Sequence, residues 1–159
     1  MEETEKKPIE KEVIHKEIDL IQACITRMAN NSFLLKGWTI SLIAVILALT
    51  EKALNPIFLC LILLIPLISF WYLDAFFLRT EKMYREMYKW VLEQRKNNNS
   101  EKLYDLNPHR FIKEVDSTLR VMWSITLRCF YGIPFFIVVM IIFAQSYKSI
   151  VSLINIICK

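Results

Sequence analysis

Three long apolar bands constrain the fold of this 159-residue chain more than any other feature. They cover residues 33–50, 57–78 and 121–144. As helices with a rise of about 1.5 Å per residue, they extend about 27 to 36 Å, close to the thickness of about 30 Å of a bilayer's hydrocarbon core. A hydrophobic content of 55% with only two glycines argues against a soluble α/β domain with glycine-rich turns. The sequence therefore predicts an all-α integral membrane protein with about three transmembrane helices.

The basic residues are distributed unequally on the two sides of these bands. Seventeen of the twenty Lys and Arg residues lie in residues 1–36, in residues 79–120 or at Arg128. The other side holds three, one in the short connection after the first band and two in the C-terminal tail. Because basic loops stay in the cytoplasm, we expect the N-terminus and residues 79–120 in the cytoplasm and the C-terminus outside.

Residues 1–32 are predicted to form an amphipathic cytoplasmic helix that continues into the first span. Apolar residues spaced four and three apart form a seam on it: Ile14, Ile18, Ile21, Ile25 and Met28. The seam needs a partner, and we favour a second copy of the chain, so that the helix serves as an oligomerisation stalk. The alternative partner is the chain's own helix at residues 80–98. Residues 79–120 are predicted to be a cytoplasmic helix and linker, with a short helical lead over 110–120 into the third band.

A polar cluster lies where the N-terminal helix meets the first span. Its members are Arg27, Asn30, Asn31, Ser32 and Lys36. Asn and Ser bond to nearby backbone, and a lysine can extend its ammonium group toward water, so a structural cap at the headgroup boundary is the simpler interpretation. The alternative is a ligand seat at a cytoplasmic mouth.

Asp74 is the most unusual charge in the apolar bands, because it lies four residues before the end of the second one. An ionised carboxylate at this depth faces protein or water rather than lipid. Its candidate partners are Arg27, Lys36 and Arg79. A structural ion pair is the favoured interpretation, and a role in ion selection is the alternative.

The third band, with the tail that follows it, contains residues that a plain anchor does not need. Arg128 either reaches the cytoplasmic surface or faces a wet interior, and Gly132 with Pro134 predicts a bend. Polar residues then recur on one face of an amphipathic tail: Gln145, Lys148, Ser149, Ser152, Asn155 and Lys159. This tail either lies on the outer leaflet or extends the third helix with its polar face toward a pore.

Motifs for catalysis, cofactors and metals are missing from the sequence. It has no glycine-rich phosphate loop and no HExxH motif, and its two histidines, His15 and His109, are isolated. The four cysteines form no CxxC pair, which favours buried thiols over disulfides or metal ligands. We therefore expect no enzyme activity, no cofactor and no metal.

Two groups of residues resemble a family of small bacterial membrane proteins. The first group is Arg27-Met28-Ala29-Asn30-Asn31-Ser32-Phe33 with Lys36-Gly37-Trp38, and the second is Trp71-Tyr72-Leu73-Asp74 with Leu78-Arg79, Glu81 and Tyr84-Arg85. The resemblance covers roughly residues 14–90. The chain is similar in these residues to membrane effectors that are encoded beside nucleotidyltransferases in antiphage defence, in particular to the channel-forming subunit of Hailong-type systems.

The resemblance implies an oligomeric ion channel, a tetramer, in the bacterial inner membrane, with its C-terminus in the periplasm. A nucleotide or short DNA oligomer made by a partner nucleotidyltransferase would control it, and opening during infection would depolarise the cell and abort the infection. Basic and polar candidates for the ligand site are Arg27, Asn30, Asn31, Lys36, Arg79, Arg85 and Lys89. Candidates for the pore or gate are Asp74, Arg128, Gln145, Ser149, Ser152 and Asn155.

Two other functions remain open at the level of sequence. One is a non-conducting membrane anchor or accessory protein whose cytoplasmic helices dock a partner. The other is a small proton-coupled transporter, for which Asp74 is the only support.

Overall fold

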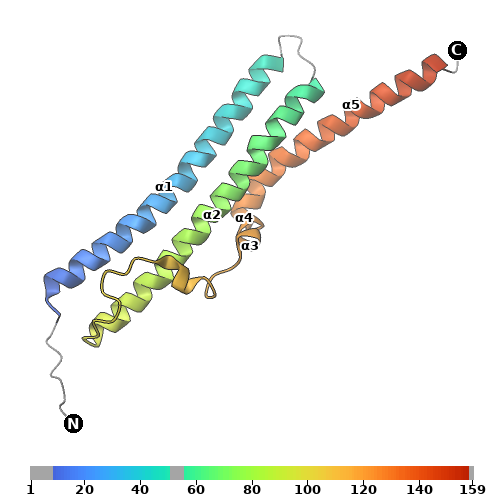
Figure 1. The fold of residues 1–159 in the computed structure, drawn as a ribbon. Helices are drawn as coiled ribbons and strands as arrows, with labels where there is room; N and C mark the ends of the chain where they lie inside the picture. The colour runs from blue at the N-terminus through green and yellow to red at the C-terminus, as the bar shows by residue number, and fades with distance from the viewer. Residues whose placement is uncertain (1–8, 51–55, 158–159) are drawn as a thin grey trace.

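The structure, a computed structural model, describes residues 9–50 and 56–157, with side chains except at residues 47, 49, 50, 56, 59, 145 and 148–157. Every regular element in this part of the chain is helical. Two long helices, α1 (Lys11–Thr50) and α2 (Pro56–Lys96), lie side by side in opposite directions (Figure 1). The fold is therefore a helical hairpin with a further helix packed against it, which agrees with the predicted all-α class.

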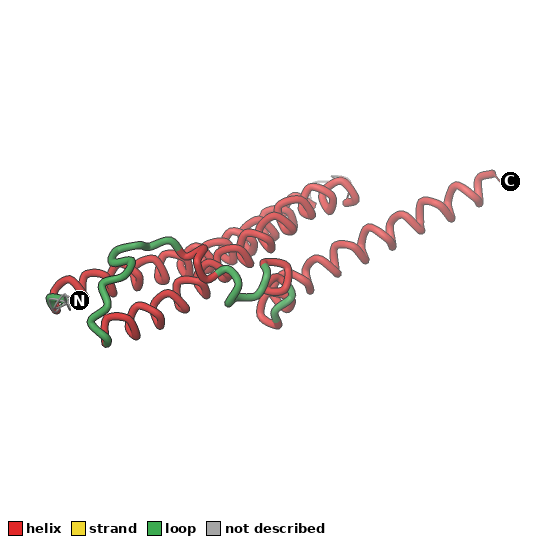
Figure 2. The backbone as a smooth tube through the Cα atoms, turned by 60° about the horizontal axis from the view of Figure 1, so that its bottom comes forward, coloured by secondary structure: helices red, strands yellow, loops and turns green. Residues whose placement is uncertain are grey.

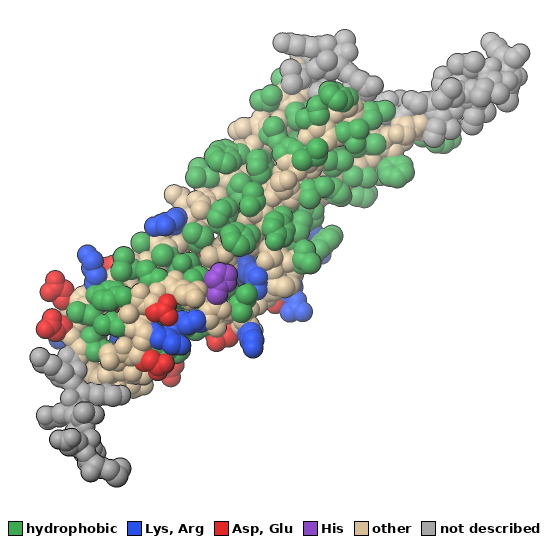
Figure 3. Space-filling view, viewed as in Figure 1, with side chains coloured by type: hydrophobic (Ala, Val, Ile, Leu, Met, Phe, Trp, Pro, Cys, Tyr) green, Lys and Arg blue, Asp and Glu red, His purple; other side chains and the backbone are tan. Residues whose placement is uncertain are grey.

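Each hairpin helix is a single rod of 40 or 41 residues, which corresponds to about 60 Å. The helix expected before the first span and the helix expected after the second span are thus continuous with those spans, and α2 continues through Pro66. We call residues 33–50 and 57–78 the apolar half of the hairpin, and residues 11–32 and 79–96 its polar half. Figure 3 shows charged side chains gathered over the polar half and hydrophobic ones over the apolar half.

The middle of the seam on the N-terminal helix packs on the chain's own α2. Ile21 is fully buried in a cluster with Met83, Met87 and Val91 of α2, and Ile25 packs against the same cluster. At Ile21 and Ile25 the partner of the seam is thus the chain's own α2, which was the alternative, and the oligomerisation stalk stays a prediction. The helix α2 serves as this partner because it carries its own apolar stripe, which supplies the complementary face nearby.

The connection between α2 and the third band is mostly irregular. It contains a 3₁₀ turn, η1 (Pro108–Phe111), and one short helix, α3 (Thr118–Met122), capped by the Ser117 hydroxyl. The predicted helical lead over 110–120 is wrong, because residues 112–117 form turns and extended chain that ends at this cap. The connection runs back along α2 toward the apolar half (Figure 1).

The third band is not one uniform helix. After α3 the helix is interrupted at Trp123 and Ser124. The chain then forms α4 (Ile125–Leu127), a π-helical turn η2 (Arg128–Gly132) and α5 (Ile133–Ile157). The irregularity expected at Gly132 and Pro134 is therefore a π turn just before α5. Because α5 continues to Ile157, the tail from residue 145 belongs to the third helix and is not a separate element.

Two helices in the described part are long and apolar enough to cross a membrane, within Cys60–Lys96 and Ile125–Ala144. The third span, at residues 33–50, stays a prediction. Large apolar side chains are open on the outside of the apolar half, such as Phe33 and Ile65, each 72% exposed, and Phe143 of α5 at 70%. Such a surface is typical of contact with lipid or with another protein.

The helix α5 contacts the hairpin over its first turns and then stands apart from it. Val138 and Ile142 pack against Ile46 of α1 and Leu63 of α2. Beyond these contacts the helix diverges from the hairpin, and its C-terminal end lies well away from it in two views (Figures 1 and 2). The backbone of the C-terminal half of α5 therefore stands apart from the hairpin.

Candidate functional site

A buried network of polar side chains joins α1, α2 and the π turn before α5, where the two halves of the hairpin meet. Its centre is Asp74 of α2, whose side chain is 0% exposed. Ser32 donates a hydrogen bond from Oγ to Oδ1 at 2.5 Å, and Lys36 places Nζ 2.5 Å from Oδ2. The Tyr131 hydroxyl donates to Oδ2 at 3.0 Å. We call these four residues the Asp74 network.

Helical spacing on α1 brings two of the partners to Asp74. Ser32 and Lys36 are four residues apart, so they lie on the same face, and Lys36 Nζ also donates to Ser32 Oγ at 2.7 Å. On α2 the next residue, Ala75, is fully buried. Its small side chain leaves room for close packing around the carboxylate. The sequence named Lys36 as one of three candidate partners of Asp74, and the structure selects it.

Tyr131 reaches Asp74 from the π turn, and an aromatic cluster fixes its position. Its ring stacks on Trp71 with centroids 6.3 Å apart and 12° between the planes. The Trp71 indole donates from Nε1 to the Met122 carbonyl at 2.9 Å. Sequence reasoning missed Tyr131, although a phenol inside an apolar band needs a hydrogen-bond partner and could have been noticed for that reason.

The contacts of Asp74 hold helices together electrostatically. A buried carboxylate is costly unless it is paired and hydrogen-bonded, and Asp74 has one ammonium and two hydroxyl partners. The Lys36 side chain is 22% exposed, so its ammonium group stays within reach of water. Among the described residues, no group of three His, Cys, Asp or Glu could hold a metal ion. The arrangement can therefore hold α1, α2 and the start of α5 in one relative position.

A second buried ion pair holds the far end of the polar half together. Glu17 of α1 and Arg95 of α2 form a bidentate pair at 2.7 and 2.9 Å, with both side chains 2% exposed. The Tyr104 backbone N–H donates to Glu17 at 3.0 Å, and Arg95 donates to the carbonyls of Asn99 and Glu101. The pair thus fixes both helices and the loop after α2.

The surroundings of Glu17 favour its charged form. Burial alone would raise the pKa of this carboxyl, but the hydrogen bonds from Arg95 and from the Tyr104 backbone, with the charge of Arg95, outweigh burial. The pKa therefore lies below its usual value of 4.5. Sequence reasoning did not pair these residues, because many acidic and basic side chains in the two helices were equally plausible partners.

The predicted ligand residues fall into several groups. Arg27 and Asn30 are exposed on α1, and Asn31 beside them is half-buried. Arg79 donates to the Asp116 carbonyl at 2.9 Å and to the Thr118 hydroxyl, so it fixes the connection rather than an open site. The remaining three, Lys36, Arg85 and Lys89, line two grooves.

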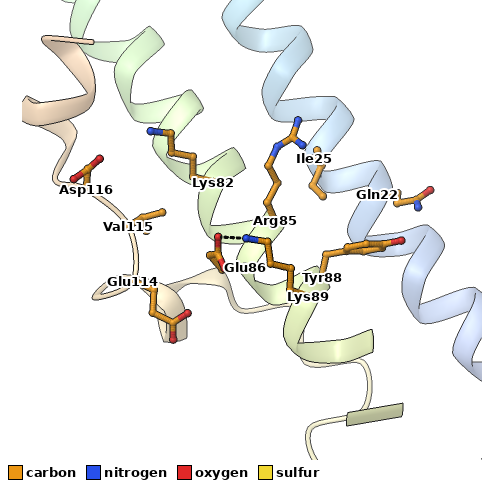
Figure 4. A pocket seen from close by; sticks show the side chains of 10 residues that line it. All are labelled: Gln22, Ile25, Lys82, Arg85, Glu86, Tyr88, Lys89, Glu114, Val115 and Asp116. Carbon is orange, nitrogen blue, oxygen red and sulfur yellow. Dashed lines mark hydrogen bonds and ion pairs between the residues drawn. The ribbon is translucent and has the colours of Figure 1, made fainter. Parts of the chain in front are cut away.

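The larger groove, of about 890 Å³, lies on the polar half (Figure 4). Three of its lining residues are basic and three are acidic: Lys82, Arg85, Lys89, Glu86, Glu114 and Asp116. Two of the cations are already paired, Lys89 with Glu86 at 2.7 Å and Arg85 with Glu81 at 2.6 Å. We call this the lower groove.

The smaller groove, of about 430 Å³, lies next to the Asp74 network. It is lined by Lys36, Lys82 and Arg85, by one acidic residue, Glu81, and by the hydroxyl residues Ser124 and Thr126 that precede α5. We call it the boundary groove, because it lies where the polar and apolar halves meet. Arg27, Asn30, Asn31 and Arg79 line neither groove.

The predicted pore residues are not brought together. Asp74 is enclosed within one protomer, and Arg128 is exposed on the π turn. The side chains of Gln145, Ser149, Ser152 and Asn155 lie outside the described residues, although the backbone of α5 continues through them. The course of the backbone puts these four positions on the part of α5 that stands apart from the hairpin.

No family model, curated protein or solved structure matches this chain.

Proposed function

We propose that this chain is the subunit of an oligomeric ion channel in the bacterial inner membrane, with α5 lining the pore. The observation that carries the proposal is the C-terminal half of α5, which diverges from the hairpin (Figure 2) and has Gln145, Ser149, Ser152 and Asn155 at helical spacing in its sequence. Polar residues on an apolar helix favour helix contacts or a wet surface.

A pore of this kind requires several copies of the chain. Three helices cannot enclose a water-filled path, so α5 helices from several protomers would have to meet around it. The exposed apolar side chains of α5, such as Phe136 at 65% and Phe143 at 70%, are available for contacts with neighbouring protomers and with lipid. We propose a tetramer, in keeping with the resemblance to Hailong-type channel subunits.

Control of the channel from the cytoplasm has a physical route in this fold. We place the polar half in the cytoplasm, where the lower groove would take an anionic nucleotide or short DNA oligomer made by a partner nucleotidyltransferase. Lys82, Arg85 and Lys89 supply the positive charge. The Asp74 network connects the hairpin to the start of α5, so a shift of α2 relative to α1 would be transmitted to the pore helix. Opening would depolarise the infected cell.

The second candidate is a non-conducting membrane anchor that docks a protein. It is favoured by the charge balance of the lower groove, where three acidic side chains accompany the three basic ones. Such a mixed surface suits a protein partner better than a polyanion. The two proposals differ in a measurable property, because only the first requires current.

Cysteine block of single-channel current tests the pore assignment. In a background with the native cysteines replaced by serine, Ser149→Cys and Ser152→Cys should make the current sensitive to a charged, membrane-impermeant thiol reagent. The matched control is Phe143→Cys, six residues from Ser149 and so on another face of α5. Equal block at Phe143→Cys, or no block at either serine position, would remove α5 as the pore lining.

A further inference from the structure

The boundary groove carries an unbalanced positive charge. Lys36 is paired with Asp74, and Arg85 with Glu81. Lys82, the third basic residue of this groove, is exposed and has no acidic partner within ion-pair distance among the described residues. In Figure 4 its side chain extends from α2 toward the connection that leads to α5. One positive charge therefore remains for a bound anion.

Polar groups suited to a phosphate lie across the groove from Lys82. Ser124 precedes α4, but its hydroxyl makes no capping bond, and the Thr126 hydroxyl lines the same groove. Neither hydroxyl has a hydrogen-bond partner among the described residues. An ammonium group facing two free hydroxyl donors matches the acceptor oxygens of a phosphodiester.

An apolar crevice adjoins the boundary groove. It has a volume of about 570 Å³ and is lined by Ile125, Cys129 and Phe130, and it shares Lys36 and Thr126 with the groove. The crevice is thus suited to a hydrocarbon chain that leaves a polar headgroup at Lys82.

The depth of the groove matches that of a lipid headgroup. Leu78 and Val121, which line it, are the predicted last residue of the second span and first residue of the third, and Lys36 lies three residues into the first span. Basic pockets between membrane helices at the cytoplasmic surface bind anionic lipid headgroups.

We propose that the boundary groove binds an anionic phospholipid of the cytoplasmic leaflet, with the phosphate at Lys82, Ser124 and Thr126 and an acyl chain in the crevice. The lipid would bridge α2 and the segment before α5, and so support the same junction as the Asp74 network. This inference rests on the proposed membrane placement but not on conduction.

Native mass spectrometry of the purified protein in neutral detergent tests the proposal, with equal amounts of phosphatidylglycerol and phosphatidylcholine added. The wild type should retain phosphatidylglycerol in preference. Lys82→Gln should weaken this retention about fivefold, which corresponds to about 1 kcal/mol for one basic residue near an anionic lipid surface. Lys82→Arg should keep the preference. Lys113→Gln, which neutralises an exposed lysine outside both grooves, should leave it unchanged.

Two results would overturn the lipid assignment. One is equal retention of the two lipids by the wild type, or equal losses in Lys82→Gln and Lys113→Gln. The other is displacement of phosphatidylglycerol by glycerophosphoglycerol at equal concentration, because the groove would then take a soluble anion. If the protein conducts ions but shows no preference for phosphatidylglycerol, only the lipid inference is refuted. If it prefers phosphatidylglycerol but conducts no current, only the proposed channel function is refuted.

Discussion

Asp74→Asn is expected to destabilise the protein by about 3 kcal/mol. The asparagine keeps the shape of the side chain but removes its charge, so the Lys36 ammonium loses its partner at 2.5 Å. Removing one member of a buried ion pair costs about 3 to 5 kcal/mol, and the 22% exposure of Lys36 places the cost at the lower end. The buried amide would also face only donor groups in their present orientation, from Ser32, Lys36 and Tyr131.

A double-mutant cycle measures the network itself. Lys36→Met combined with Asp74→Asn leaves no unpaired charge, so the two losses should not add, and we expect a coupling free energy of about 2 kcal/mol. The free energy of unfolding would be measured by titration with sodium dodecyl sulfate in mixed micelles, followed by tryptophan fluorescence.

Asp19→Asn is the control for this series, because Asp19 is an exposed acid of α1 and a surface substitution of this kind changes stability by about 0.5 kcal/mol or less. If Asp74→Asn costs no more than this control, or if the two losses simply add, Asp74 is not the electrostatic centre of the helix junction.

Three further predictions concern the rest of the fold. Because the pKa of Glu17 is lower in the folded chain than its usual value of 4.5, its contribution is complete above that value and is lost as the pH falls through the folded pKa. Limited proteolysis of residues 97–107 should therefore accelerate in acid, and Glu17→Gln should raise the rate already at neutral pH and flatten its pH dependence. Trp71→Phe removes the 2.9 Å bond to the Met122 carbonyl and should cost about 1 to 2 kcal/mol in the same titration. Gly132→Ala should be tolerated within about 1 kcal/mol, because the nearest atoms to the added methyl lie at ordinary contact distances of 3.6 and 3.8 Å.

The local patterns of the sequence predicted the rods. Apolar bands and the absence of Gly or Pro between residues 9 and 36 favour one continuous helix, and α1 is such a helix. The same pattern could not decide what covers the seam around Ile21, because a copy of the chain and its own α2 present equally suitable apolar stripes. Only the packing of Met87 and Val91 against it settles this point.

Long-range polar pairs were harder to predict. Tyr131 and Asp74 are 57 residues apart, and Glu17 and Arg95 are 78 apart. These pairs form only at particular rotations and shifts of α2 against α1 and of α5 against α2. Local sequence patterns carry no information about such rotations and shifts. Gly132 and Pro134 predicted a disturbance but not its form, a π turn that turns Tyr131 toward Asp74. Lys36 could be named because the start of the first span and the end of the second must meet in a hairpin.

The junction at Asp74 would transmit motion from the hairpin to α5 in the proposed channel. Each of the two hairpin helices is about twice as long as a bilayer core is thick. A motion in the polar half can reach the proposed pore helix α5 only if α5 is bonded to the hairpin. Two hydrogen bonds make this connection, on either side of the helix interruption before α5. Tyr131 donates to Asp74, and Trp71 donates to the Met122 carbonyl.

Single-channel recording tests whether the protein forms an ion channel. The purified wild-type protein would be placed in planar bilayers, with and without nucleotide extract from cells that carry its genomic neighbours. We predict discrete conductance steps whose open probability changes when the extract is added. A bilayer that stays silent at all voltages, with protein shown to be folded and inserted, would contradict the channel and leave the anchor as the function.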